Sequence, residues 1–516
     1  MKPISRLTFG VVGVALLVAI PALMRAQMTA GPSVAKPYGL GLPRDHDRLV
    51  LPDSAYPRFP LMPGQEAYKD VDGLKIKALV KEITAISDKS RDAGDLYWGR
   101  ITGTPYDRMT TDWMLDQFKR LGLENVHREE FTAAPVWYPT SVSAAYTVDG
   151  KTSPLTTIFP IAETKPTGPA GVTADAVWLG LGTAADFVGR DVRGKAAVIY
   201  SILTPGGRNH SAGDRSGAYD SINRANKAGA AMVIAIMGLP GNGLFEPEGA
   251  DQTTVPSMTL SQDEGYVLRD LLGAGKQVRI SLKLAIDERR DLKSANVFGT
   301  LPGMSDEQVF VMAHTDSFFE GAMDNASGIA MLVDIARHYA ALPRSARPRT
   351  MVFAGTPDHH HGSAGLYKIR DSYDWSKVAL IVNAEHPSQT LLYVFGGDLM
   401  TSNAISARRW YASGNDAFKR LVYDTLRDFN VSVYTVPETN AGGSLGPLTS
   451  KAPAFHIIDH VIYHTTLDTP DLVPAWGLED ATRAFLKIID SANKMTRTEI
   501  GPAAPARAGR GAAPAN

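Results

Sequence analysis

The stretch VFVMAHTDSFFEGAMDNASGIAMLVDIARHY, residues 309–339, decides how the second half of this chain folds. It opens with an apolar run typical of a buried β-strand, and His314 and Asp316 follow at the end of that run. Asp324 comes next, ahead of the small residues NASG and an apolar pattern with helical spacing. The stretch therefore predicts a strand, a loop and a helix, with an imidazole and two carboxylates close to the end of the strand.

Further strand-like runs alternate with helical patterns between residues 293 and 500. The clearest are QVFVMAH (308–314), RTMVFAG (349–355) and VALIVNAE (378–385). Their apolar residues are nearly continuous, which is typical of parallel strands covered on both faces. We therefore predict an α/β fold with a mixed, mostly parallel central sheet and helices on both faces.

The preceding part of the chain predicts helices and then a second, β-rich region. Residues 73–92 have apolar spacing of three and four, and residues 110–131 predict a helix that ends at Gly122 and a strand that begins near Val126. From 150 to 285, short β-rich runs are separated by Gly, Pro and Asn. We expect residues 150–285 to form a small inserted domain.

The two ends of the chain have distinct compositions. Residues 1–26 combine Lys2 and Arg6 with a long apolar run, which is typical of a secretory signal peptide and predicts export to the periplasm or the medium. An uncleaved membrane anchor is the alternative, and it would be the chain's contact with a membrane. Residues 27–74 are expected to form an extended arm, and the Pro-, Ala- and Gly-rich residues 499–516 a disordered tail.

Composition limits the chemistry that the chain can use. It has no cysteine, so disulfides, thiolate metal sites and cysteine nucleophiles are excluded. A formal net charge of -1 provides no field that would attract nucleic acid, and we expect no such partner. Any metal site must therefore be built from His, Asp and Glu.

Four predicted strand ends carry such groups, and strand ends are where open α/β sheets bind ligands. A site for two divalent ions needs neutral imidazoles and carboxylates, one of them able to bridge. Asp316, two residues after His314, could hold the His314 imidazole in one tautomer. The five candidate ligands are His314, Asp324, one histidine of 359–361, Glu385 and His464.

At these residues the sequence resembles the di-zinc aminopeptidase and carboxypeptidase family, of the bacterial leucine aminopeptidase and plasma glutamate carboxypeptidase type. HTDSFFEGAMDNASG (314–328) is similar to the family's His-x-Asp-Ser and Gly-Ala-x-Asp-Asn-x-Ser-Gly segments, and YHTTLDTPD (463–471) to its closing His-Thr-x-x-Asp-Thr segment. GRITGTPYDRMTTDWMLDQFKRLGL (99–123) resembles its opening segment. The resemblance covers roughly residues 75–495.

The resemblance implies a peptidase domain in two parts, 75–149 and 286–498, with an inserted protease-associated domain at 150–285. VRGKAAVIYS (192–201) and ANKAGAAMVIAI (225–236) carry the likeness to the insert. It also implies two zinc ions. One would be bound by His314, Asp324 would bridge both, Glu385 stands where the family usually has Asp, and His464 completes the second.

Two segments depart from the family pattern. The family has Glu-Glu-x-Gly-x-x-Gly, whose first Glu is the general base and whose second is a ligand, whereas HHHGSAG (359–365) places His359 and His360 there. Imidazole suits both roles, and Asp358 is a rival base if the loop shifts by one residue. GGSLGPLTSKAPAF (442–455) lacks the Asp-His pair that the family often has before its last strand.

We therefore hypothesise an exported zinc-dependent exopeptidase-like hydrolase that acts on peptides or small amides. Loss of both glutamates leaves two alternatives open: a degenerate homologue that binds metal or peptide without hydrolysis, and a hydrolase of a non-standard amide. Glu320 is expected to be a solvated loop charge. Structural or supporting roles are expected for the remaining histidines near the strand ends, His361, His386, His456 and His460.

Overall fold

A computed structural model describes residues 50–200, 221–246, 253–395, 397–434, 441–458, 462 and 464–505 of the chain, within a unit that spans Asp45–Asn516. The predicted signal peptide, residues 27–49 of the predicted arm and residues 506–516 of the predicted tail lie outside these residues. Among the residues described, no helix combines the length and the apolar character that crossing a membrane requires.

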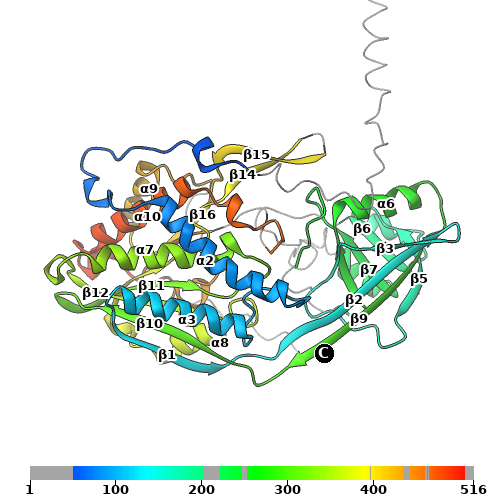
Figure 1. Cartoon of the computed structure of the whole chain (residues 1–516), viewed down its shortest axis with the longest axis horizontal. Coiled ribbons are helices and arrows are strands. Elements are labelled where there is room, and N and C mark those ends of the chain that lie inside the picture. The colour runs from blue at the N-terminus through cyan, green and yellow to red at the C-terminus, as the bar shows by residue number, and fades with distance from the viewer. Residues whose placement is uncertain are drawn as a thin grey trace, which may run out of the picture. The chain divides into compact units, whose positions relative to one another are not determined.

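The central sheet has seven strands in the order β1-β10-β12-β11-β13-β17-β16 (Figure 1). β11 pairs in parallel with β12 and β13, and β13 pairs in parallel with β17, whereas β1, β10 and β16 are joined by antiparallel pairing. The predicted α/β fold with a mixed central sheet is confirmed, but three of its six strand pairs are antiparallel, so the sheet is not mostly parallel. The bounds are β1 Glu124–Thr132, β10 Lys293–Leu301, β11 Ser305–His314, β12 Arg349–Thr356, β13 Val378–Asn383, β16 Arg409–Ala412 and β17 Ala454–Ile458.

Helices cover both faces of this sheet because successive residues of each strand point to opposite sides. Val309 and Val311 of β11 pack in the core under one helical layer, and Phe310 and Met312 pack in a second core on the other face. The first layer contains α2 Gly73–Asp92, α3 Pro105–Arg120, α7 Gly328–Ala340, α9 Asp416–Asp428 and α10 Ala475–Ala492, and the second contains α8 Ala364–Ser372.

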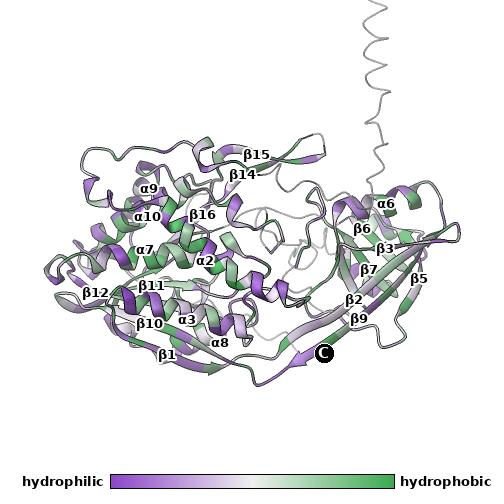
Figure 2. Cartoon of the chain, viewed as in Figure 1, coloured by the Kyte–Doolittle hydropathy of each residue, from purple (hydrophilic) through white to green (hydrophobic). Residues whose placement is uncertain are grey.

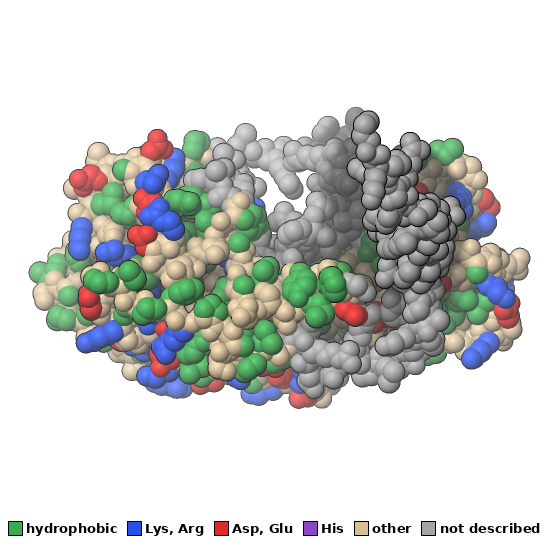
Figure 3. Space-filling model, turned by 90° about the horizontal axis from the view of Figure 1, so that it is seen from above, with side chains coloured by type: hydrophobic (Ala, Val, Ile, Leu, Met, Phe, Trp, Pro, Cys, Tyr) green, Lys and Arg blue, Asp and Glu red, His purple; other side chains and the backbone are tan. Residues whose placement is uncertain are grey.

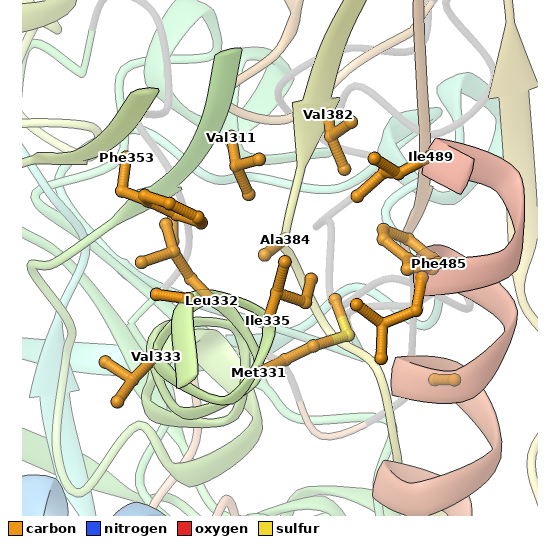
Figure 4. Packing of buried hydrophobic residues seen from close by; sticks show 14 of the residues in the cluster. Val311, Met331, Leu332, Val333, Ile335, Phe353, Val382, Ala384, Phe485 and Ile489 are labelled. Carbon is orange, nitrogen blue, oxygen red and sulfur yellow. The ribbon is translucent and has the colours of Figure 1, made fainter. Parts of the chain in front are cut away.

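Helix α7 is at the centre of the first layer. It is predominantly hydrophobic in Figure 2, and most of its residues are buried. Val311 and Val382 point from their strands toward Leu332 and Ile335 of α7, and Phe485 of α10 faces the same layer (Figure 4). Full burial of a side chain of this size contributes about 1.5–3 kcal/mol. This packing fixes the helix that begins directly after Asp324 and Asn325.

The two predicted N-terminal helices begin and end at recognisable signals. Asp72 caps α2 by accepting hydrogen bonds from Leu74 and Lys75, and Thr104 caps α3 ahead of a proline at its first position. Gly122 follows α3 with a φ of 74°, a left-handed conformation that glycine adopts readily. The predictions of a helix over 73–92, a stop at Gly122 and a strand close to Val126 are confirmed.

A second, eight-stranded sheet has the order β3-β2-β9-β5-β6-β7-β8-β4, and α5 Ser221–Lys227 and α6 Gln262–Gly273 accompany it. It extends from Val136 to Arg289, so it includes β2, which lies in the range assigned from sequence to the first peptidase segment. β2 pairs with β9 over most of its length. The strands are β2 Val136–Val148, β3 Lys151–Leu155, β4 Ile158–Pro160, β5 Val172–Trp178, β6 Ala196–Tyr200, β7 Met232–Ile236, β8 Ser257–Leu260 and β9 Arg279–Arg289.

The remaining elements are small. A hairpin of β14 Thr390–Phe395 and β15 Asp398–Ile405 follows β13, and α11 Arg497–Ile500 ends the described helices.

Cationic and anionic side chains are interspersed over the described part of the face seen in Figure 3. That face therefore carries no broad field of one sign.

Candidate metal centre

The candidate site lies at the carboxyl ends of the parallel strands. His314 is the last residue of β11, the 358–361 loop follows β12, and Glu385 follows β13. Because β11, β12 and β13 are parallel neighbours, their carboxyl ends meet at one edge of the sheet. His464 reaches the same place from the segment after β17, and its Nε2 lies 3.3 Å from Asp324 Oδ2.

Asp324 occupies the middle of the site, and its two carboxylate oxygens face different groups. Oδ1 lies 3.0 Å from His314 Nε2 and 2.9 Å from His386 Nε2. Oδ2 lies 3.6 Å from His360 Nε2 and 3.3 Å from His464 Nε2. A carboxylate in this position can bridge two cations, with one pair of imidazoles on each side.

Glu385 completes one side of the site. Its Oε1 lies 3.7 Å from His314 Nε2 and 4.0 Å from His386 Nε2. The structure thus brings together the five ligands proposed from sequence, with His360 supplying the imidazole from the 359–361 run. It also adds His386, for which we had expected a structural or supporting role.

The arrangement fits divalent zinc. Zinc bonds of about 2.0–2.1 Å in a tetrahedron place neighbouring donors about 3.3 Å apart, close to the separations found here. Nitrogen and oxygen donors of this kind suit zinc, and two sets, His314 with Glu385 and His386, and Asp324 with His360 and His464, each lie within 4.8 Å. Asp324 Oδ2 and the His314 ring nitrogens are buried and make no hydrogen bond of good geometry within the described residues.

Neighbouring groups hold the central carboxylate in position. Asp468 accepts hydrogen bonds from the backbone N–H groups of Met323 (2.7 Å) and Asp324 (3.0 Å). The Asn325 side chain donates to the carbonyl oxygens of His314 and Ala384, so it ties the ends of two strands together. Asp468 lies in the YHTTLDTPD segment, but no role is predicted for it from the sequence.

Asp316 lies where the sequence placed it, with Oδ1 3.4 Å from His314 Nδ1. Its other oxygen accepts a hydrogen bond from the backbone N–H of His360 at 2.9 Å. Asp316 therefore contacts the ring of His314 and the backbone of His360, both of them proposed ligands. Such outer carboxylates fix ring orientation at metal sites.

The second oxygen of Glu385 is held by a separate network. Oε2 accepts hydrogen bonds from Asn383 Nδ2 at 2.5 Å and from Ser444 Oγ at 3.0 Å, and His456 Nδ1 lies 3.7 Å away. Gly443 leaves room for this longer acid, because a Cβ there would lie 2.6 Å from both carboxylate oxygens. Gly443 and Ser444 belong to the segment that lacks the family's Asp-His pair, so that segment serves to position Glu385.

The 358–361 run divides its side chains between different surroundings. Asp358 accepts a hydrogen bond from the N–H of Ala364 at 2.8 Å, at the start of α8, and does not belong to either ligand set. The His359 ring lies 4.5 Å from the His314 ring and 4.9 Å from the His360 ring, between centroids. His361 Nε2 lies 3.3 Å from the hydroxyl of Tyr97, and His361 belongs to neither ligand set.

The inserted sheet's segment contributes a carboxylate close to His464. Residues 244–246 run antiparallel to 464–466, with a hydrogen bond from Glu246 N to His464 O of 3.0 Å. Glu246 Oε2 lies 3.6 Å from His464 Nδ1, and both side chains are buried. Nothing in the sequence near Glu246 signals this contact, because the two residues are far apart along the chain.

Burial and charge together set the protonation of the site. Burial disfavours the charged carboxylates of Asp324 and Glu385, but the nearby imidazoles outweigh it and hold their pKa values below the usual range. Burial lowers the pKa of His360 well below its usual value, which favours the neutral form that binds metal. Despite burial, Asp316 and Asp324 raise the pKa of His314 to about 10, so a cation bound there would compete with that proton.

Burial raises the pKa values of two further acids, Asp358 and Glu320. Burial raises the pKa of Asp358 to about 7. Glu320 is partly buried rather than fully solvated, and burial raises its pKa to about 7 although Arg91 lies 3.7 Å away. The loop that carries Glu320 is held by the buried guanidinium of Arg100, which donates to the carbonyl oxygens of Thr315, Glu320 and Gly321.

Known structures share this fold. Peptidase M28 precursor from Shewanella amazonensis aligns with a TM-score of 0.64 and 19% identity over 86% of this chain and 97% of its own. The zinc aminopeptidase BSAP from Bacillus subtilis aligns with a TM-score of 0.59 and 17% identity over 84% and 98%. The aminopeptidase from an Aneurinibacillus strain aligns with a TM-score of 0.55 and 19% identity over 83% and 95%.

Sequence comparison matches part of the chain to a family. A probable glutamate carboxypeptidase of Zea mays is 22% identical over 351 residues, which cover 58% of this chain and 49% of the maize protein. The chain thus spans about half the length of this curated relative. The model of peptidase family M28 matches residues 296–489, a range that contains every candidate ligand described above. Residues 296–489 therefore form a domain of peptidase family M28.

Proposed function

We propose that this chain is an exported, zinc-dependent hydrolase that cleaves peptide or small amide bonds with the site around Asp324. The observation that carries the proposal is that each oxygen of one buried carboxylate faces its own pair of imidazoles. The family match supports hydrolysis, and the sequence of residues 1–26 supports export.

Two ions would be held by five side chains, those of His314, Asp324, Glu385, His360 and His464. When bound, such ions polarise the scissile carbonyl and acidify the attacking water. The chain's own groups keep the donors in place: Asp316 and Asp468 fix His314 and Asp324, and Ser444 fixes Glu385.

His359 is the best-placed general base. It is only partly buried, whereas Asp358 is fully buried at the start of α8. Its ring lies beside the rings of His314 and His360, so an attacking water between the two ligand sets would be within its reach. His359 would accept the proton of that water and return it to the leaving amine.

A non-hydrolytic binding protein is the second candidate, because His359 and His360 stand where the family carries two glutamates. Elemental analysis for zinc, followed by assays on aminoacyl, dipeptide and blocked substrates with and without chelator, separates the two. Chelator-sensitive turnover supports the hydrolase, and turnover on blocked substrates alone assigns it a non-standard amide. Bound zinc without turnover on any substrate supports the binding protein.

Variants of the histidine run test the individual roles. His359→Ala should lower kcat by about 10²- to 10⁴-fold with zinc retained, as expected for loss of a general base. His360→Ala should lower zinc content. His361→Phe is the matched control, since its ring packs against Tyr97 and Phe318, and it should keep both activity and zinc. Equal behaviour of all three variants would contradict these assignments.

A further inference from the structure

We propose that His386 is a sixth protein ligand and that it closes one of the two metal sites. In this arrangement one ion would be held by four protein donors, from His314, Asp324, Glu385 and His386, and the other by three, from Asp324, His360 and His464. The inference rests on the proposed function, because it assumes the pair of ions, and it adds an asymmetry between them.

The geometry of the His386 ring carries the inference. Its Nε2 lies 2.9 Å from Asp324 Oδ1 and 4.0 Å from Glu385 Oε1, and it forms one of the compact donor sets with His314 and Glu385. Four donors at such separations match a tetrahedral zinc site. In the absence of an ion, the same nitrogen can donate a hydrogen bond to Asp324, so the two roles must be separated by experiment.

The backbone at His386 is built to turn this ring inward. His386 has a φ of 51°, a left-handed conformation that costs a non-glycine residue about 1 kcal/mol or more. Its N–H donates to Asn325 Oδ1 (3.4 Å), and its carbonyl accepts from Nε of the buried Arg408 (2.9 Å). His464, on the other side of Asp324, adopts a similar φ of 56°.

The two ions would therefore differ in how many coordination positions the protein fills. A zinc with four protein ligands is typical of a structural site, whereas one with three keeps a position open for water or substrate. The open position would belong to the ion at His360 and His464. The ring of His359, the proposed base, lies between the two sites, 4.5 Å from the His314 ring and 4.9 Å from the His360 ring, so it can reach a water at the open position.

The test measures zinc stoichiometry and affinity by competition with a chromophoric chelator in the parent protein and two variants. His386→Ala removes both roles, and His386→Gln keeps a hydrogen-bond donor but replaces the imidazole. If His386 is a ligand, both variants should lose one zinc, with affinity at that site reduced more than about 100-fold, beyond the 10- to 100-fold typical of an outer contact. Retention by the Gln variant within about 10-fold of the parent would overturn the proposal.

Controls separate this inference from the proposed function. His127→Ala removes an exposed histidine on β1 and should bind two zinc ions as the parent does. A parent without bound zinc would refute the proposed function itself, whereas two tight ions in both His386 variants would refute only the inference. A crystal structure of the zinc-loaded parent decides the matter without variants: His386 Nε2 should lie about 2.0–2.1 Å from an ion, and more than about 3 Å would refute ligation.

Discussion

Replacing Gly443 by alanine should weaken zinc binding, and it should destabilise the metal-free fold no more than alanine at Gly442 does. A Cβ at Gly443 would lie 2.6 Å from both carboxylate oxygens of Glu385, and ordinary contact begins at 3.4 Å. The carboxylate must therefore retreat by the difference between these two values, about 0.8 Å, whereas zinc sites tolerate errors of about 0.2 Å in bond length. We expect the affinity of the site formed by His314 and Glu385 to fall at least about 10- to 100-fold.

Gly442 provides a matched control. It has a φ of 66°, against 50° at Gly443, so alanine at either position pays about 1–2 kcal/mol for a left-handed backbone. A Cβ at Gly442 would instead approach the end of the Arg409 side chain at 2.8 Å, and that side chain can move. Denaturant unfolding of the metal-free proteins should therefore give similar losses for the two variants.

The zinc affinities, measured by chelator competition, should differ between the two variants. Glu385→Asp withdraws the carboxylate by about one carbon–carbon bond, roughly 1.5 Å, and should relieve the clash. A double-mutant cycle of Gly443→Ala with Glu385→Asp should show a favourable coupling of about 0.5–3 kcal/mol in zinc binding. Equal zinc affinities of the Gly442 and Gly443 variants would refute the reasoning.

Three further changes have expected outcomes. Asp468→Asn replaces one of the two carboxylate oxygens that accept from backbone N–H groups by a donor. The variant should cost about 1–3 kcal/mol in urea unfolding, and an unchanged midpoint would contradict its role. Glu246→Gln removes the charge 3.6 Å from His464 Nδ1 and should weaken zinc binding about 10- to 100-fold, measured by chelator competition. An unchanged zinc affinity would show that Glu246 does not support His464. Burial raises the pKa of Asp107 to about 7, so the folded chain keeps a proton that the unfolded chain loses, and the free energy of unfolding should fall as pH rises from about 4 to 7. Asp107→Asn should remove up to about 4 kcal/mol of that fall, and parallel unfolding profiles of parent and variant between pH 4.5 and 7.5 would refute this.

The secondary structure around the central sheet could be predicted because local signals and packing agree. Residues 73–92 form a helix with the predicted bounds, since the apolar period, the Asp72 cap and burial against the sheet select the same residues. The limits of the inserted sheet could not be found in this way. The Asp149–Gly150 turn, with positive φ at both residues, joins β2 to β3 within the second sheet, so this local signal does not mark the point at which the chain leaves the first sheet.

The candidate ligands could be predicted where they lie at strand ends, whereas Asp316 alone among the supporting groups could be predicted from the sequence. His314, Glu385 and His464 are predicted as ligands because several strand ends carry such groups together, which is a stronger signal than any one of them alone. Glu246 reaches His464 only through tertiary pairing of two distant segments. The inward turn of His386 depends on a positive φ that its sequence context does not reveal.

The histidine run shows why spacing alone could not assign a base and a ligand. Two carboxylates pin this loop: Asp316 accepts from the N–H of His360, and Asp358 accepts from the N–H of Ala364. The left-handed backbone at Asp358 (φ 74°) directs the chain away from β12. Because both anchors are backbone contacts, they set the direction of each following ring whatever its chemistry. These two anchors therefore do not depend on which side chains stand at 359 and 360, so the choice between His359 and Asp358 as base depends on which side chain the loop leaves accessible.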